Sequence, residues 1–228
     1  MSRGWFIVFA KAPRPGLVKT RLSPPLSLDQ SAEFYEQMLA DVLCASSRFA
    51  VDFALDPVLA FHPPDGVAEL IDRAPLGFRL QAQRGLGLAE RMANAFAEGA
   101  AAGARWVLLR GSDSPALGAA EVETAVSCLE GGDDLVLTPD EGGGYAMVGL
   151  RQPCPELFNL PMSTQETLGL TLDIAHRLGL STALTSPAFD IDTTADLVAL
   201  DLLSEEESSD LCPRTVGAIA AFRSDGVL

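Results

Sequence analysis

The first residues suited to chemistry are cations in a loop that contains prolines and glycine. Lys11, Lys19 and Arg21 lie in the run FAKAPRPGLVKTRL, which also contains Gly16. Cations bind phosphate oxygens, and a glycine lets the backbone approach a ligand closely. The run matches neither the GxxxxGK(S/T) phosphate loop nor the GxGxxG dinucleotide fingerprint. The residue types predict a phosphate-binding loop, and the alternative is a solvated basic segment.

Acidic side chains that could hold a divalent cation follow later apolar segments. Asp113 lies in the segment RGSDSP, which directly follows the apolar run Trp106–Leu109, and Asp190 and Asp192 lie in FDIDTTADL. Magnesium needs only one or two protein carboxylates. In an extended segment Asp190 and Asp192 would face the same way and could share a metal ion or a hydroxyl. In both segments the alternative is that these polar residues cap the helix that follows.

Three consecutive glycines in the run TPDEGGGY form another candidate segment. Glycines cost backbone entropy, so the run predicts a turn with special dihedral angles or a closely approaching ligand. A plain hairpin turn is the alternative. Other chemistries have little support, because the chain has only two histidines, His62 and His176. A histidine-rich zinc site is excluded, and a Ser-His-Asp triad is not expected.

The elements that must position these residues alternate along the chain. We expect strands at Trp5–Phe9, Val58–Phe61, Phe78–Gln81, Trp106–Leu109, Leu135–Leu137 and Tyr145–Leu150. We expect helices at Asp29–Ser47, Val67–Arg73, Leu88–Ala102, Ala119–Leu129, Gln165–Leu178, Thr194–Leu203 and Pro213–Phe222. The alternation predicts an α/β fold with a mostly parallel sheet and helices on both faces. Ligands bind outside the carboxyl ends of such strands, so the candidate segments should meet at one rim.

Length and composition are typical of a globular protein. The chain has 228 residues, of which 48% are hydrophobic and 21% charged, and it has no linker or internal repeat. We therefore expect a single domain over residues 1–228, in which Glu205–Glu207 of the acidic stretch Ser204–Asp210 form a solvated turn or helix end. The N-terminal apolar run is too short to predict a signal peptide, and no apolar run is long enough to predict a membrane span. The four scattered cysteines indicate free thiols and a cytoplasmic protein.

The charge of the chain restricts its partners. The net charge is −15, which argues against nucleic acid and anionic membranes as partners. No acidic residue precedes Asp29, and both lysines of the chain lie in that same stretch. A concentrated cationic segment in an acidic protein favours the binding of a small anion.

Taken together, the motifs resemble a known family. The runs FAKAPRPGLVKTRL, GLAERM, GSDSPAL, GGGYAMVGL, MSTQET and DIDTTADL occur in that order between Phe9 and about Leu200. In this they resemble the rSAM/selenodomain-associated transferase family, of the nucleotide-diphospho-sugar transferase superfamily. The resemblance implies a Rossmann-like GT-A sheet and a bound Mg²⁺ or Mn²⁺ ion.

The resemblance also implies roles for single residues. Those implied to bind the nucleotide phosphates are Lys11, Gly16, Lys19 and Arg21. Asp113 is implied as a metal ligand, and Asp192 as a group close to the metal or the transferred group. Those implied to shape the substrate pocket are Arg91, Gly143, Gly144 and Tyr145. The sequence departs from the family pattern at Gly87 and Gly142, where the family usually has aspartate.

The function expected is metal-dependent glycosyl transfer from a nucleotide diphosphate-sugar to a small-molecule acceptor. One alternative is nucleotidyl transfer, in which a nucleoside triphosphate is joined to a phosphorylated small molecule and pyrophosphate leaves. Asp192 as a second metal ligand favours this alternative. A further alternative, motivated by Gly87 and Gly142, is a nucleotide-binding protein without catalytic activity.

Overall fold

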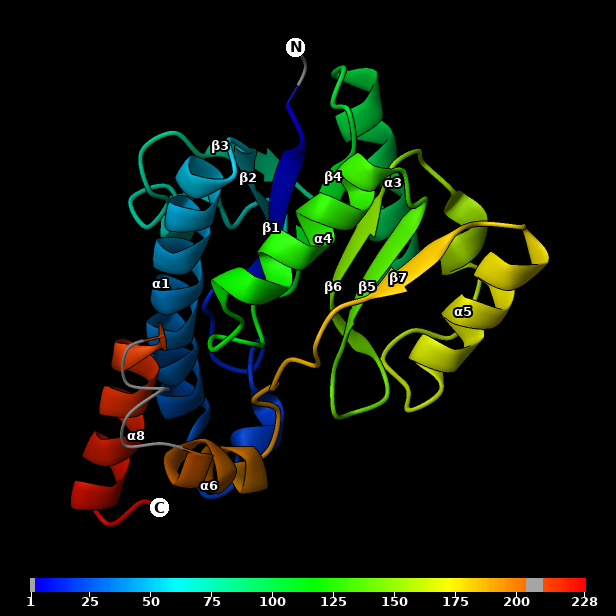
Figure 1. The fold of residues 1–228 in the computed structure, drawn as a ribbon. Coiled ribbons are helices and arrows are strands. Elements are labelled where there is room, and N and C mark those ends of the chain that lie inside the picture. The colour runs from blue at the N-terminus through cyan, green and yellow to red at the C-terminus, as the bar shows by residue number, and fades with distance from the viewer. Residues whose placement is uncertain (1–2, 204–210) are drawn as a thin grey trace.

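A seven-stranded sheet forms the centre of the computed structural model, which describes residues 3–203 and 211–228 (Figure 1). The strands are β1 (Trp5–Lys11), β2 (Asp56–His62), β3 (Arg79–Ala82), β4 (Val107–Arg110), β5 (Leu135–Pro139), β6 (Tyr145–Leu150) and β7 (Thr182–Leu184). Their order across the sheet is β3-β2-β1-β4-β6-β5-β7. Within the described residues β6 alone runs antiparallel to its neighbours. The predicted mostly parallel sheet is therefore confirmed.

Helices of the described residues cover both faces of this sheet. They are α1 (Leu28–Asp52), α2 (Val67–Leu70), α3 (Leu88–Ala101), α4 (Ala119–Gly131), α5 (Thr167–Arg177), α6 (Thr194–Leu203) and α8 (Pro213–Ser224). Short 3-10 turns lie at η1 (Thr20–Leu22) and η2 (Pro155–Phe158). Each predicted helix matches one of these, and the acidic stretch at 204–210 lies outside the described residues. None of the described helices is long and apolar enough to cross a membrane.

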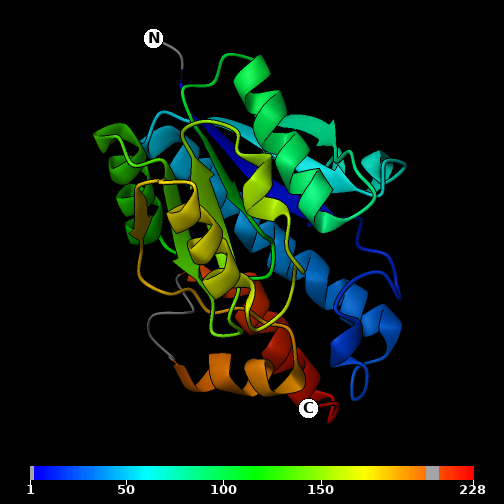
Figure 2. The same cartoon turned by 90° about the vertical axis from the view of Figure 1, so that its right-hand side faces the viewer.

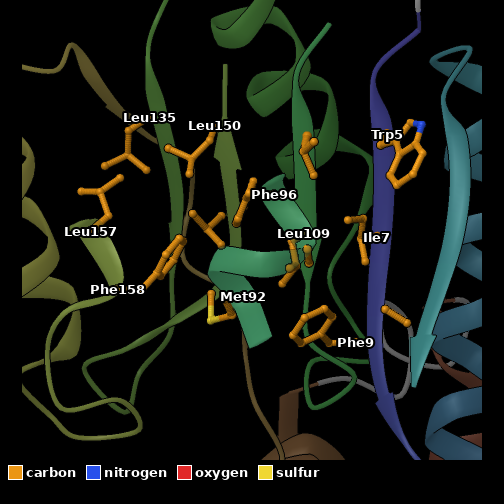
Figure 3. Close-up of a cluster of buried hydrophobic side chains, with 14 of the residues drawn as sticks. Trp5, Ile7, Phe9, Met92, Phe96, Leu109, Leu135, Leu150, Leu157 and Phe158 are labelled. Carbon is orange, nitrogen blue, oxygen red and sulfur yellow. The ribbon is translucent and has the colours of Figure 1, made fainter. Parts of the chain in front are cut away.

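The two faces of the sheet bury alternate side chains of the same strand. In β1, Trp5, Ile7 and Phe9 belong to the core cluster beneath α3, η2 and α5 (Figure 3). Phe6 and Val8 point the other way, toward α1 and α4. Figure 2 shows α3 and α5 in front of the sheet and α1 behind it. Full burial of each large apolar side chain contributes about 1.5–3 kcal/mol, and a shift of the strand by one residue would expose these side chains. The alternation therefore fixes the face of the sheet on which every later residue of β1 lies.

A separate apolar cluster lies beyond the carboxyl end of β1 and joins η1, α1, α6 and α8. It contains Leu22, Phe34, Ile191, Leu197 and Phe222 among others. Figure 1 shows η1, α6 and α8 together at the lower end of the view. This cluster brings the segment after β1 next to the segment before α6, although they are far apart in the sequence. It thereby positions two of the predicted site segments.

Candidate functional site

Three predicted site residues meet at one point of the carboxyl edge. The side chain of Lys19 is only 4% exposed, and its ammonium group forms ion pairs with the carboxylates of Asp113 and Asp192. The distance from Lys19 Nζ to Asp192 Oδ1 is 3.1 Å, and Nζ also donates to the carbonyl of Ile191. The two segments that carry the carboxylates are joined directly, because Ile191 N donates to the carbonyl of Asp113 at 2.9 Å. One buried cation thus connects three loops.

The charge of Lys19 is stabilised where it lies. Burial of the side chain opposes the charged form, but the carboxylates of Asp113 and Asp192 outweigh burial and hold the pKa of Lys19 above its usual value. The backbone of Lys19 is left-handed, with φ at 45°, which is uncommon for a residue other than glycine. The ammonium group is consequently a fixed and neutralised cation.

Arg21 and Lys11 are placed differently from Lys19. The guanidinium of Arg21 lies 3.5 Å from Asp192 Oδ2, and its side chain is 69% exposed. Lys11, the last residue of β1, is exposed and no described carboxylate forms an ion pair with it. Gly16 is exposed with φ at 78°, so the loop between them uses the left-handed conformation that glycine favours. Of the three cations predicted to bind phosphate, Lys11 and Arg21 are therefore the two that are exposed to a ligand.

The possibility that Asp113 and Asp192 serve as helix caps does not hold. Helix α4 begins at Ala119 and is capped by the carboxylate of Glu121, which accepts from Gly118 N at 3.1 Å. At the start of α6 the carboxylate of Asp196 accepts from the backbone of Asp192 and Thr193, at 2.9 and 2.6 Å. The carboxylates of Asp113 and Asp192 therefore remain directed to Lys19.

Asp190 and Asp192 have different partners. The carboxylate of Asp190 accepts from the hydroxyl of Ser114, whereas that of Asp192 pairs with Lys19 and Arg21. Burial, with smaller contributions from Asp113 and Asp140, raises the pKa of Asp190 to about 7. The segment is not a regular strand, and its two carboxylates have different partners within the chain, so the hypothesis that they share a metal ion or a hydroxyl stays a prediction.

Two buried polar residues support the Asp113 loop, and sequence reasoning missed both. The hydroxyl of Tyr35 accepts from Lys11 N at 2.9 Å and lies 2.9 Å from Ser112 Oγ, so it ties the end of β1 to the loop after β4. Burial raises the pKa of Tyr35 to about 12. Arg110 is fully buried and donates to the carbonyl of Ser114 at 2.6 Å. A charged residue at the end of the apolar run before Asp113 was the available signal.

The triple glycine is a hairpin turn between β5 and β6. Gly143 has φ at 84°, and a Cβ there would lie 2.1 Å from the carbonyl oxygen of Gln165. The amide of Gly144 donates to Asp140 Oδ1 at 2.8 Å. The close approach is thus made by the chain's own backbone. Tyr145 packs against the cluster beneath α3 and α5, and burial raises its pKa to about 12. No hydrogen bond or ion pair in the described part of the chain joins this turn to Lys19.

Arg91 lies in the first turn of α3, on the other side of β1 from the hairpin. Its Nε atom is buried, and no described residue accepts a hydrogen bond from it. Burial lowers the pKa of this guanidinium below its usual value.

The two carboxylates that contact Lys19 are ligands of the type that a divalent cation binds. The side chains of Asp113 and Asp192 are 48% and 49% exposed, so each has carboxylate surface outside the lysine contact. Two carboxylates are enough for Mg²⁺ or Mn²⁺, which complete their coordination with water and substrate phosphates. Among residues 3–203 and 211–228 no group of three or more His, Cys, Asp or Glu is arranged to hold a metal.

A shallow hollow of about 400 Å³ lies elsewhere, between β3 and α3. Its lining includes Trp5, Arg79 and Ala102. The hollow runs along β3, at one side of the sheet, and its lining includes none of Lys19, Asp113 and Asp192. Arg79 covers the Trp5 ring, with 4.7 Å between guanidinium carbon and ring centroid. We do not assign the candidate site to it.

Solved structures show the fold class of this protein. A protein from Desulfovibrio desulfuricans G20, provisionally assigned as a nucleotide-diphospho-sugar transferase, is 27% identical, with a TM-score of 0.88 over 98% of this chain and 96% of that one. CMP:2-keto-3-deoxy-manno-octonic acid synthetase, solved with CTP, is 13% identical, with a TM-score of 0.58 over 89% and 98%. Glucosyl-3-phosphoglycerate synthase from Mycobacterium tuberculosis, solved with Mn²⁺ and UDP, is 15% identical, with a TM-score of 0.54 over 93% and 80%.

The fold is therefore the Rossmann-type, GT-A-like fold of nucleotide-diphospho-sugar transferases, as the sequence predicts. The chain belongs to the DUF2064 family, described as uncharacterized proteins conserved in bacteria, whose model matches residues 47–164. None of the curated proteins compared with the sequence matches it.

Proposed function

We propose that this chain is a transferase that uses a nucleotide-activated donor, and that it transfers a glycosyl group from a nucleotide diphosphate-sugar to a small acceptor. The observation that carries the proposal is the convergence of Lys19, Asp113 and Asp192 at the carboxyl edge. Ligands of open α/β sheets bind at this edge. The similarity to the Desulfovibrio protein over nearly the whole of both chains supports the same class of reaction.

Glycosyl transfer requires stabilisation of the departing nucleoside diphosphate. The acceptor oxygen attacks the anomeric carbon, and the diphosphate leaves with the electron pair of the broken bond, so its negative charge grows. Preorganised cations stabilise such charge. In our proposal Lys11, Lys19, Arg21 and the backbone at Gly16 surround the phosphates, with the exposed Lys11 and Arg21 making the direct contacts.

A divalent cation fits the proposal. Asp113 and Asp192 would hold Mg²⁺ or Mn²⁺, whose positive charge neutralises the diphosphate when it is bound. The Mycobacterium synthase solved with Mn²⁺ and UDP supports this choice at the level of the fold. For the remaining substrate contacts we propose Arg91 on the α3 side of β1 and, on the other side of β4, the hairpin of Gly143, Gly144 and Tyr145.

Nucleotidyl transfer is the second candidate, and one observation favours it. The carboxylates of Asp113 and Asp192 both contact the ammonium group of Lys19, so they lie close together. Asp192 could therefore serve as a second ligand to a metal ion that binds a triphosphate. In this reaction a phosphorylated acceptor attacks the α-phosphate of a nucleoside triphosphate, and pyrophosphate leaves. The synthetase solved with CTP has the same fold.

Ligand screening followed by product identification tests the proposal. We would measure the melting temperature with nucleotide sugars and nucleoside di- and triphosphates, each with and without Mg²⁺. A ligand at about a hundred times its Kd adds about 2.7 kcal/mol of stability. Stabilising donors would then be incubated with acceptors, and the release of nucleoside diphosphate or pyrophosphate followed by chromatography.

The variant Asp113→Asn should abolish the effect of Mg²⁺ on donor binding. Asp52→Asn is the matched control. Asp52 is an exposed aspartate at the last position of α1, and it forms no ion pair with Lys19. Diphosphate release identifies glycosyl transfer, and pyrophosphate release identifies nucleotidyl transfer. A nucleotide that binds without turnover over a wide acceptor panel would instead indicate a non-catalytic binding protein. Absence of any nucleotide-dependent stabilisation would refute the proposal.

We also propose that residues 1–228 form one domain and that the protein is cytoplasmic. In the described structure none of the four cysteines forms a disulfide, which supports a reducing compartment.

A further inference from the structure

Lys11 and His62 lie side by side at the carboxyl ends of β1 and β2. They are register partners in a parallel pair, so their side chains point to the same face of the sheet. That face is the one beneath α3, because Phe9 and Ala60, two residues earlier in each strand, belong to the α3 cluster (Figure 3). Lys11 and His62 therefore continue the α3 face beyond the end of its apolar core.

Arg91 reaches the same place from the helix. It is one residue before Met92 of the same cluster, and Leu88 and Ala95, three residues before and four after, also pack there. Positions with this spacing share one side of a helix, so Arg91 projects from the sheet-facing side of α3. The first turn of α3 lies at the carboxyl edge, since the loop before it is joined to the end of β2 through Gln83 N and the carbonyl of Phe61, at 2.8 Å.

The electrostatics agree with this geometry. The groups that act on His62 are Arg91, Lys11 and the more weakly opposing Asp65. Burial and then the charges of Arg91 and Lys11 hold the pKa of His62 below its usual value. Asp65 itself pairs with Arg14, at 3.1 Å. The cluster therefore has a surplus of positive charge.

Lys11 and Arg91 differ from the other cations at this edge. Lys19 is neutralised by Asp113 and Asp192, and Arg14 by Asp65 and Glu69. No described carboxylate forms an ion pair with Lys11 or Arg91, although acidic residues outnumber basic ones by 31 to 16 in the chain. Two cations without an ion-pair partner lie beside an imidazole, and one buried guanidinium nitrogen has no acceptor, so the cluster offers several hydrogen-bond donors to an anion.

We propose that His62 and Arg91 join Lys11, which the proposed function already places beside a phosphate, in a phosphate-binding subsite whose side chains are not part of the Lys19, Asp113 and Asp192 cluster. It adjoins that cluster through one hydroxyl, because Tyr35 contacts both Lys11 N and Ser112, the neighbour of Asp113. The inference rests on the proposed function in that the phosphate belongs to one of its substrates. Either a donor nucleotide or a phosphorylated acceptor supplies the same chemical group.

The imidazole of His62 reports directly on this subsite. The chain has two histidines, so proton NMR resolves both titrations, and His176 serves as an internal control. The first probe is sulfate, a tetrahedral dianion whose charge is constant between pH 5 and 8, compared with chloride at equal ionic strength. We expect sulfate to raise the pKa of His62 by about one unit, because an anion favours the imidazolium, and to leave His176 unchanged.

Three variants distinguish a built subsite from general attraction. Arg91→Gln and Lys11→Gln should each remove most of the sulfate-dependent shift, and Lys11 is exposed, so that variant is not expected to disturb the fold. Arg105→Gln removes the same charge from an exposed position before β4, at the opposite edge, and should keep the shift. Equal pKa values of His62 in sulfate and chloride, or an undiminished shift in both Arg91→Gln and Lys11→Gln, would overturn the proposal.

Two further probes identify the source of the phosphate. If UDP moves the His62 signal at a concentration at least tenfold lower than glycerol 3-phosphate does, the subsite takes the donor. The reverse order assigns it to a phosphorylated acceptor. The variant Asp113→Asn should retain the sulfate-dependent shift of the His62 pKa, even if no transfer reaction is ever detected. The test of the subsite is therefore independent of the test of the proposed reaction. Transfer activity combined with an unresponsive His62 would refute the subsite alone.

Discussion

Replacing Lys19 by methionine should increase the affinity of the protein for a divalent cation in the absence of nucleotide. The ammonium group and a metal ion compete for the same two carboxylates, those of Asp113 and Asp192. Methionine has a similar length and no charge, and it can fill the space of a side chain that is only 4% exposed. The carboxylate of Asp113 then loses its counter-ion, that of Asp192 keeps only the exposed Arg21, and both are available to the metal.

The magnitude follows from the charges and their exposure. Two unit charges 4 Å apart interact by about 4 kcal/mol at an effective dielectric constant of about 20. Both carboxylates are about half exposed, at 48% and 49%, so solvent reduces this value. We expect a gain of about 1.5–3 kcal/mol in metal binding, which corresponds to a tenfold to hundredfold lower Kd. The free energy of unfolding should fall, but by less than the roughly 3–5 kcal/mol typical of removing one partner from a buried ion pair, because both remaining carboxylates are half exposed and can be hydrated.

Isothermal titration with MnCl₂ and MgCl₂ measures this effect. The control is Lys11→Met. Lys11 is the other lysine of the chain, and it forms no ion pair with Asp113 or Asp192. The double variant Lys19→Met/Asp113→Asn should bind Mn²⁺ no better than the wild type. If Lys19→Met binds Mn²⁺ no more tightly than the wild type, or if Lys11→Met gains as much, competition at the two carboxylates is wrong.

Three other predictions concern stability. Gly143→Ala should lower the free energy of unfolding by about 1–3 kcal/mol, and by more than Gly77→Ala, since both have positive φ but only Gly143 has backbone within 4 Å of the added Cβ. Asp41→Ala should cost about 1–3 kcal/mol by urea unfolding, because the buried carboxylate accepts from Thr215 N and Thr215 Oγ1, each at 2.8 Å, at the start of α8. The pKa of Asp190 is raised to about 7, so the folded protein holds more protons than the unfolded chain between about pH 4 and 7. Stability from this group should fall as the pH rises through that window, and Asp190→Asn should remove that part of the pH dependence.

Most of the fold was predictable because its signals are local. Apolar runs and helical spacing gave every strand except β7 and located the described helices to within a few residues. Strand β7 was missed because it is a three-residue edge strand whose side chains are mostly exposed, and so it lacks an apolar run. The reversal of β6 follows from its short connection to β5, since a turn over residues 140–144 permits only an antiparallel pair.

The meeting of Lys19, Asp113 and Asp192 was predictable only in outline. The rule that loops after parallel strands share one edge placed these segments together. It did not show that the ammonium of Lys19 lies between the two carboxylates, because that contact joins residues 173 positions apart and depends on the packing of η1 against α6. The supporting contacts of Tyr35 were hidden for a similar reason, since an aromatic residue within an apolar helical stripe indicates only burial.

The pairing of Lys19 changes the charge argument for nucleotide binding. From the sequence, the loop after β1 supplies three cations to a phosphate chain. In the structure one of them is neutralised by two carboxylates, so Lys11 and Arg21 remain as the open charges of that loop. Attraction of a polyphosphate to a protein of net charge −15 must then come partly from elsewhere, and the unpaired Arg91 is suitably placed at the same edge. If the Lys11, His62 and Arg91 subsite takes the donor, isothermal titration with UDP should show that Arg91→Gln weakens nucleotide binding at least as much as Lys11→Gln.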